Sequence, residues 1–387
     1  MSTAADAPAV PEVIEEHYLN EPTGVEAENN PEPDVSPNPW NPEQIRVSTK
    51  QFSLRNVMDM IQDESLELAP DFQRGKVWKA TQKSRLIESV LLQIPLPAFY
   101  FAEDADGTMK VVDGLQRLST IHGFVRGPAD EAFPLKDLEY LVQENGHTFD
   151  DLAAPWKRRI NNAQIIAHVI DPTTPSDVKY DIFKRINTGG TPLNNQEIRH
   201  CMSKDRSRSV LREMTGTEEF DEATNGLGGH TRMQDREMAL RFAAFWLQSV
   251  DSYLNRPGMD AFLESATRLL DSPDEVPDNK VKELKEAFRK AMRNCHLVFG
   301  PHAFRKWPID SEHRKPINRA LFETWSLTLA GYEYDDLRQR RTCITNEARE
   351  RMTDDFEYLD AITSSTGDRE RVRYRFLVTE EAAGAGL

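Results

Sequence analysis

Strand-forming sequence is confined to the first half of this 387-residue chain, and this distribution limits the folds open to it. Short apolar runs at Phe99–Phe101, Met109–Val112 and Ile165–Ile170 have the length and flanking turn residues of strands. Helical periodicity is found between these runs, and beyond about residue 200 it is found almost alone. The pattern predicts an α+β fold class, with a mixed N-terminal domain followed by an all-helical C-terminal domain.

Helix signals complete this outline. In the mixed domain, helices are expected after Ser53, from Thr81, and over 115–125, 149–161 and 176–186. Farther along, the expected helices cover 193–214, 231–250, 258–270, 279–298, 316–330, 344–362 and 368–378.

Residues 1–42 differ in composition from the rest of the chain. They hold nine acidic residues and eight prolines but no Lys or Arg, so a disordered acidic tail is expected. A solubilising role is favoured over competition with nucleic acid for a basic groove. The whole chain has a net charge of −16, whereas residues 43–387 carry 55 acidic against 48 basic residues, or −7. The acidity therefore does not exclude a local phosphate-binding surface.

Cysteine usage and hydropathy exclude several classes of protein. Cys201, Cys295 and Cys343 are too widely spaced for a disulfide framework or a CxxC zinc site. The N-terminus lacks a signal-peptide pattern, and no apolar run approaches ~18 residues. A soluble, cytoplasmic protein without a membrane partner is expected. No Walker-type, HExxH or GxSxG motif is present.

The most informative motif lies where the apolar run ending at Val112 meets the next helix. Asp113 and Gly114 form a turn, and the helix that follows offers backbone N–H groups and a positive dipole end to an anion. Arg117 is suited to phosphate, Asp113 to a divalent metal, and Gln116 to positioning a water. The spacing alone also allows a structural reading, in which Asp113 caps the helix and Arg117 forms a surface pair.

Two flanking segments add specificity. Pro70–Trp78, followed by Leu86–Pro97, lies upstream of Asp113–Arg117, and Ile182–Arg199 lies downstream. In this order the three motifs resemble the N-terminal domain of GmrSD-type restriction endonucleases, a family named for its DGQQR motif. The resemblance covers roughly residues 48–205.

The resemblance implies a ParB/sulfiredoxin-like fold for the mixed domain, which we expect over 43–205. The helical periodicity predicts a helical domain over 206–387. The resemblance also implies nucleotide binding and hydrolysis coupled to defence against modified phage DNA. Carried over by position, Asp113, Gln116 and Arg117 are the candidate catalytic residues, with Asp113 as the ligand of Mg²⁺. The candidate nucleotide-binding residues are Gln73, Arg74, Gly114, Arg185 and Asn187.

The chain departs from the family in two ways. The first Gln of the motif is Leu115, which puts hydrolysis in doubt unless this side chain simply faces the core. The second departure is that we find no HNH-type nuclease unit, since His296, His302 and His313 lie among helical segments. A formal PD-(D/E)xK match around Asp278 falls on an amphipathic helix and is read as structural.

Two basic clusters remain. Lys204, Arg206 and Arg208 follow the third motif and are weak candidates for DNA binding. Near the C-terminus four arginines alternate, and they are expected on a helix whose buried face holds Val372 and Phe376. A solvated face is the default expectation for both clusters. The alternating residues are Arg369, Arg371, Arg373 and Arg375.

These features predict an NTP-binding, Mg²⁺-dependent NTP-hydrolysing component of a bacterial restriction or anti-phage system that acts on modified DNA. The alternative is a non-hydrolytic module that senses NTP or DNA and regulates a separately encoded nuclease. A self-contained nuclease is a third option, but we identify no acid cluster for it.

Overall fold

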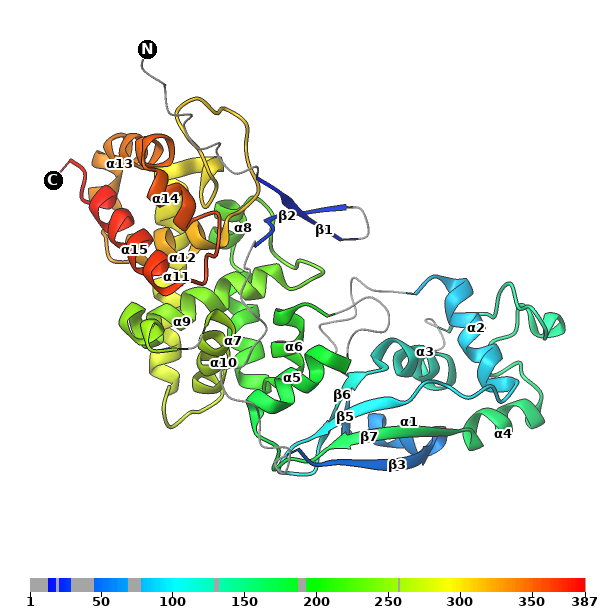
Figure 1. Cartoon of the computed structure of the whole chain (residues 1–387). Coiled ribbons are helices and arrows are strands. Elements are labelled where there is room, and N and C mark those ends of the chain that lie inside the picture. Colours follow the sequence, from blue (N-terminus) through cyan, green and yellow to red (C-terminus); the bar gives the residue numbers. More distant parts are fainter. Residues whose placement is uncertain are drawn as a thin grey trace, which may run out of the picture. The chain divides into compact units, whose positions relative to one another are not determined.

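The computed structural model describes residues 13–18, 21–28, 45–68, 78–128, 132–186, 193–256 and 258–386. The chain divides into two compact units (Figure 1). We call residues 39–202 the sheet unit, and residues 1–38 together with 203–387 the helical unit. The sequence predicted domains over 43–205 and 206–387, so the observed division differs mainly in assigning the N-terminus to the helical unit.

The sheet unit alternates strands and helices. Its described elements are β3 (Val47–Ser53), α1 (Leu54–Gln62), β4 (Leu66–Glu67), α2 (Ala80–Leu91), β5 (Phe99–Glu103), β6 (Met109–Asp113), α3 (Leu115–Arg126), η3 (Val142–Glu144), α4 (Ala154–Asn162), β7 (Gln164–Ile170), α5 (Ser176–Ile186) and α6 (Asn195–Met202). Among the described residues the sheet has five strands in the order β3-β7-β5-β6-β4. The central strand β5 runs parallel to β7 and antiparallel to β6.

Apolar side chains pack on both faces of this sheet, since successive side chains of a strand point to opposite faces. Phe99, Phe101 and Val111 belong to one apolar cluster, which includes buried residues of α1, α2, α3 and α4. Ala102 and Val112 belong to a second cluster with residues of α5 and α6. The structure confirms the α+β prediction, while kinship with the ParB/sulfiredoxin fold stays a prediction.

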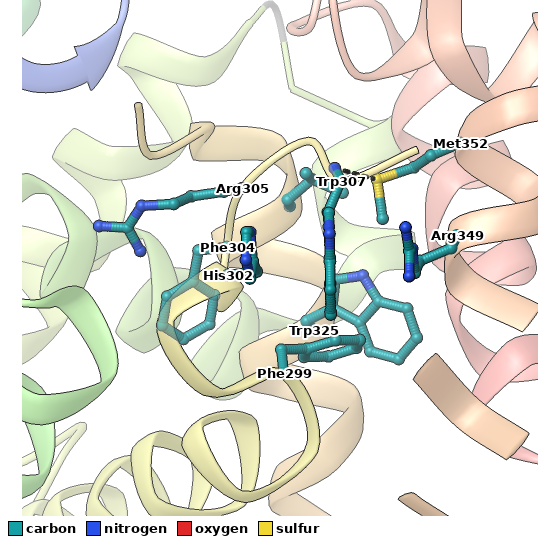
Figure 2. Close-up of a pocket in the computed structure, with 9 residues that line it drawn as sticks. Phe299, His302, Phe304, Arg305, Trp307, Trp325, Arg349 and Met352 are labelled. Carbon is teal, nitrogen blue, oxygen red and sulfur yellow. Dashed lines mark hydrogen bonds between the residues drawn. The ribbon is translucent and has the colours of Figure 1, made fainter. Parts of the chain in front are cut away.

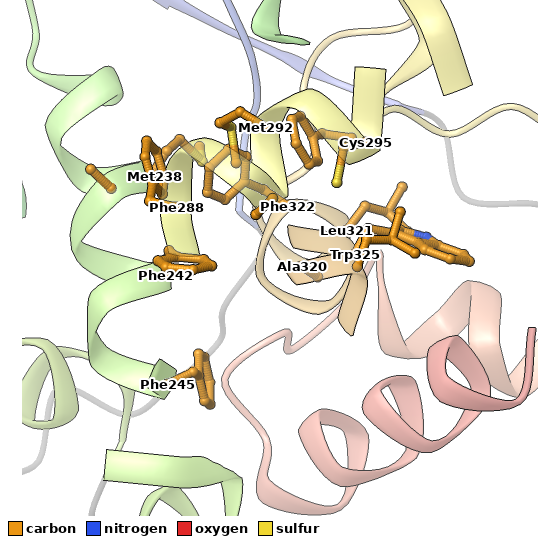
Figure 3. Packing of buried hydrophobic residues seen from close by; sticks show 14 of the residues in the cluster. Met238, Phe242, Phe245, Phe288, Met292, Cys295, Ala320, Leu321, Phe322 and Trp325 are labelled. Atoms are coloured by element: carbon orange, nitrogen blue, oxygen red, sulfur yellow. The ribbon is translucent and has the colours of Figure 1, made fainter. Parts of the chain in front are cut away.

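The helical unit is built from helices apart from a short N-terminal hairpin. Its described elements are β1 (Glu15–Tyr18), β2 (Glu21–Glu26), α7 (Asp205–Thr215), α8 (Glu218–Thr224), α9 (Gln234–Leu254), α10 (Met259–Leu270), α11 (Asp278–Phe299), η4 (Gly300–His302), α12 (Arg319–Ala330), α13 (Tyr334–Asp354), α14 (Phe356–Ala361) and α15 (Arg369–Ala383). Figure 3 shows its core, in which Phe242 of α9 packs edge-on against Phe288 of α11, with a ring-centroid distance of 5.1 Å. Helices make up most of the described residues after 202, as the sequence predicts. None of the described helices has both the length and the apolar character of a membrane span.

The prediction of a disordered tail over 1–42 is wrong for residues 13–18 and 21–28. Strands β1 and β2 pair antiparallel, and Val25 is completely buried in the core of the helical unit. The backbone N–H of Glu26 donates to the oxygen of Ile317 at 2.8 Å. Composition suggested disorder because it does not reveal that these acidic side chains meet buried cations more than 200 residues away. The other residues of this tail lie outside the described ranges.

The C-terminal arginine series needs a similar correction. Helix α15 forms as predicted, with Val372 and Phe376 buried. However, Arg375 is completely inaccessible to solvent and forms an ion pair with Glu323, which is also buried. A fully solvated arginine face is therefore wrong for this position, because Arg375 lies on the same buried side of the helix as Val372.

A buried carboxylate fixes the loop after α3 in the sheet unit. Glu88 of α2 is 4% exposed, and it accepts hydrogen bonds from the backbone N–H groups of Glu139, Tyr140 and Leu141 at 2.8–3.1 Å. Burial by itself raises the pKa of Glu88, but the three backbone donors more than offset it, and the pKa is lowered.

We expect Glu88→Gln to lower the free energy of unfolding of the sheet unit by about 1–3 kcal/mol, since an amide turns N–H donors toward N–H donors. Because the folded-state pKa is lowered, the carboxylate's contribution is present above the unfolded-state pKa and is lost as pH falls through the folded-state pKa. Urea unfolding at neutral and acid pH should show the difference between wild type and variant shrinking at acid pH. The control is Glu139→Gln, which removes an exposed ion pair with Arg85. It should change the free energy of unfolding by less than about 0.5 kcal/mol.

Candidate functional site

The turn between β6 and α3 is the candidate functional site of the sheet unit. Strand β6 ends at Asp113, and Gly114 has φ +97° and is the N-cap of α3. A Cβ atom at this position would lie 2.3 Å from a ring carbon of Phe99, which is completely buried. Glycine is therefore required here both by the left-handed backbone and by the closeness of the aromatic ring.

Arg117 holds this turn against the start of β5. Its guanidinium donates to Oδ2 of Asp113 at 2.9 Å, to the oxygen of Ala98 at 3.2 Å, and to the oxygen of Pro97. The guanidinium carbon also lies 4.3 Å from the ring centroid of Phe99. Burial lowers the pKa of Arg117, and the charge of Asp113 works in the opposite direction. These bonds use three of the five N–H groups of the guanidinium, so the side chain holds the turn in place within the fold.

The remaining residues of the turn differ in accessibility. The side chain of Asp113 is 31% exposed, and Gln116 is half-buried. Leu115 is also partly buried and packs against the apolar cluster of Phe99 and Phe101. The departure from the family motif therefore places an apolar side chain where it has apolar neighbours. The chemistry open to this turn is anion binding by the first backbone N–H groups of α3, with one carboxylate beside them.

The structure describes part of the rest of the predicted site. Gln73, Arg74 and Asn187 lie outside the described residues. Arg185 is exposed in the last turn of α5, a helix that covers the face of the sheet opposite to α3. Tyr180 and Phe183 of α5 belong to the same apolar cluster as Val112, the residue before Asp113. Helix α5 thus shares an apolar cluster with the strand that ends at the candidate carboxylate.

The predicted DNA-binding cluster is mostly engaged within the helical unit. Arg206 donates to the oxygen of Val276 at 2.7 Å and pairs with Asp278 at 2.9 Å. Arg208 is 8% exposed and donates to the oxygen of Ser203 at 2.7 Å. Lys204 is exposed. Two of the three side chains therefore stabilise the fold around α7, and their use in DNA binding stays a prediction.

Metal ligands do not converge elsewhere in the described part of the chain. Within those residues, no three His, Cys, Asp or Glu side chains lie together in an arrangement that could hold a metal ion. Asp113 offers one partly exposed carboxylate, which suits Mg²⁺ only when phosphate oxygens and waters supply the other ligands. The residues present therefore fit a nucleotide-bound Mg²⁺ rather than a permanent metal centre.

The helical unit contains a small pocket, which is shown in Figure 2. His302 stacks on Trp307 with ring centroids 4.0 Å apart, and the guanidinium of Arg349 lies over the Trp307 ring at 4.4 Å. The cavity has a volume of ≈ 10 Å³, which is room for about one water molecule. These side chains stack on one another and leave little room for a ligand, so the cluster is best explained as packing.

One comparison with known proteins bears on the sheet unit. Residues 55–203 match the model of the GmrSD restriction endonuclease N-terminal domain. The match includes the β6–α3 turn and confirms, for this segment, the resemblance inferred from the three motifs. It associates the GmrSD-type segment with restriction endonucleases. No curated protein matches the chain.

The geometry of the turn leads to a stability prediction. We expect Gly114→Ala to lower the free energy of unfolding of the sheet unit by about 2–4 kcal/mol, from left-handed strain together with overpacking against Phe99. The matched control is Gly107→Ala in the β5–β6 turn, where φ is +89° but no atom lies within 4 Å of the new Cβ. It should cost about 1–2 kcal/mol. Equal losses in urea unfolding would contradict the close approach to Phe99.

Proposed function

We propose that this protein is a nucleotide-binding component of a bacterial restriction or anti-phage system, with its nucleotide site at the β6–α3 turn. The observation that carries the proposal is the left-handed Gly114 at the N-terminus of α3, inside the segment that matches the GmrSD model. A helix N-terminus preceded by such a glycine lets phosphate oxygens approach backbone N–H groups closely.

In this proposal each residue of the turn has a separate task. The backbone N–H groups of Leu115 and Gln116 donate hydrogen bonds to phosphate oxygens, and Asp113 would hold a nucleotide-bound Mg²⁺. Arg117 acts as a positioning residue, because its guanidinium fastens Asp113 and the start of β5 in one geometry. The amide of Gln116 would orient the attacking water. Fixed donors of this kind favour hydrolysis by stabilising the charge that develops on the phosphoryl oxygens.

A second candidate function is a nucleotide-gated switch that does not hydrolyse NTP and instead regulates a separately encoded nuclease. Two observations favour it. Arg117 is already bonded to two main-chain oxygens and to Asp113, and Leu115 is apolar where the family motif has Gln. Under either function, modified DNA is the proposed target, and residues such as Gln73, Arg74, Arg185 and Asn187 stay candidates for completing the nucleotide site.

The two functions differ in NTP turnover. With Mg²⁺ and each of the four NTPs, we expect turnover that falls at least about tenfold in Asp113→Asn and Gln116→Ala. Saturable NTP binding without turnover, alone and with modified phage DNA, would contradict the hydrolase and support the switch. Plasmid DNA in the same reactions tests cutting by the protein itself.

A matched variant separates chemistry from loss of charge. Asp106 is exposed in the β5–β6 turn of the same sheet unit. Asp106→Asn should leave NTP binding and turnover within about twofold of wild type, because a carboxamide can still accept the turn hydrogen bond from Thr108. If Asp106→Asn and Asp113→Asn behave alike, the site does not lie at the β6–α3 turn.

A further inference from the structure

The N-terminal hairpin, taken together with the two residues that follow β2, places three carboxylates among cations of the helical unit. Glu26 pairs with Lys306 at 2.6 Å, and Glu28 pairs with Arg241 at 3.0 Å. Glu16 pairs with Arg319 at 3.1 Å. These partners come from α9, α12 and the segment after η4, so one short acidic segment spans three separate parts of the unit.

Side-chain amides extend the same contacts. Asn318 donates to the second oxygen of Glu26 at 3.1 Å, and Gln234 donates to Glu16 at 2.8 Å. Arg319 also donates to the main-chain oxygen of Glu26 at 2.7 Å. The site therefore combines charged and neutral donors, which is the chemistry that recognises oxyanions.

The cations of this site are buried and outnumber the carboxylates of the helices around them. Arg241, Arg319 and Lys306 are 3–7% exposed, and Arg375 is wholly buried. The helices contribute two carboxylates to this group, Glu237 and Glu323. Without the hairpin, four cations would face two carboxylates, a surplus of two positive charges. With Glu16, Glu26 and Glu28 the group has a net charge of −1.

The hairpin is held mainly by these polar contacts. Val25 is the one apolar side chain that is fully buried among residues 13–18 and 21–28, while Ile14 is 64% exposed. Ion pairs and hydrogen bonds can be exchanged for equivalent bonds to another anion, whereas a large apolar contact cannot. A buried ion-pair network is also an uncertain source of net stability, so its presence calls for a further explanation.

We propose that the helical unit contains a binding site for the phosphate backbone of DNA, occupied in cis by Glu16, Glu26 and Glu28 of the N-terminal hairpin. The hairpin carboxylates mimic the phosphates and keep the site closed until DNA displaces them. Because the cations are spread over three segments, the site suits a polyanion better than a single phosphate. This inference goes beyond the nucleotide site of the sheet unit, and its test does not require NTP.

The test compares two triple variants of the full chain with the same net charge. Glu16→Gln, Glu26→Gln and Glu28→Gln are combined in one protein. Three exposed residues of the same unit, changed as Glu218→Gln, Glu222→Gln and Glu370→Gln, form the control. Binding of a non-specific 20-base-pair duplex should tighten about tenfold or more in the hairpin variant, because the open state no longer has to be drawn from a minor population. The control should change less than about twofold.

Three further measurements complete the test. Adding Lys306→Gln to the hairpin variant should reverse much of the gain in DNA affinity. ATP added as a competitor should displace the duplex only weakly. If the hairpin variant does not fold, as judged by circular dichroism, hydrogen exchange of wild-type Gly24–Glu26 is measured during titration with DNA. Faster exchange with DNA supports the proposal. Unchanged exchange, or a folded hairpin variant that binds DNA no tighter than the control, overturns it.

Discussion

Each unit depends on hydrogen bonds and ion pairs between buried arginine side chains and acceptors within the same unit. In the sheet unit Arg117 joins α3 to the start of β5 through two main-chain oxygens and Asp113. In the helical unit Arg241 and Arg375 both bond to the buried Glu323, which connects α9, α12 and α15. A buried guanidinium with incomplete bonding costs several kcal/mol, so these acceptors fix the local backbone closely.

This commitment changes how phosphate recognition can work in the two units. At the β6–α3 turn Arg117, the arginine of the family motif, stabilises the local backbone. The donors proposed for phosphate are the backbone N–H groups that follow Gly114. In the helical unit the buried cations pair with Glu237 and Glu323 of the helices and with carboxylates of the N-terminal hairpin. Both arrangements follow from the same electrostatic requirement. The proposed anion site of the sheet unit is open at the backbone, whereas the proposed site of the helical unit is filled by Glu26 and its neighbours.

The sequence predicted the sheet unit well where periodicity was strong. Strands β5, β6 and β7 and helices α3 and α5 lie within a few residues of their expected positions, because their apolar residues repeat with clear strand or helix periods. It missed β3, whose residues are mostly exposed and polar. It also missed the hairpin of β1 and β2, whose acidic side chains have ion-pair partners that are distant in sequence. The Asp113–Gly114 turn was predicted, but the fastening role of Arg117 depends on main-chain oxygens that no sequence pattern marks.

The account's central claim is that the backbone at the start of α3 binds nucleotide phosphate. The most direct measurement is amide-resolved hydrogen exchange or NMR of Leu115, Gln116 and Arg117 during titration with an NTP and Mg²⁺. The account predicts slower exchange or shifted amide resonances at these three positions, saturating with nucleotide, while the amide of Gly107 in the β5–β6 turn is unchanged. Saturable nucleotide binding that leaves the amides of α3 unaffected would contradict it.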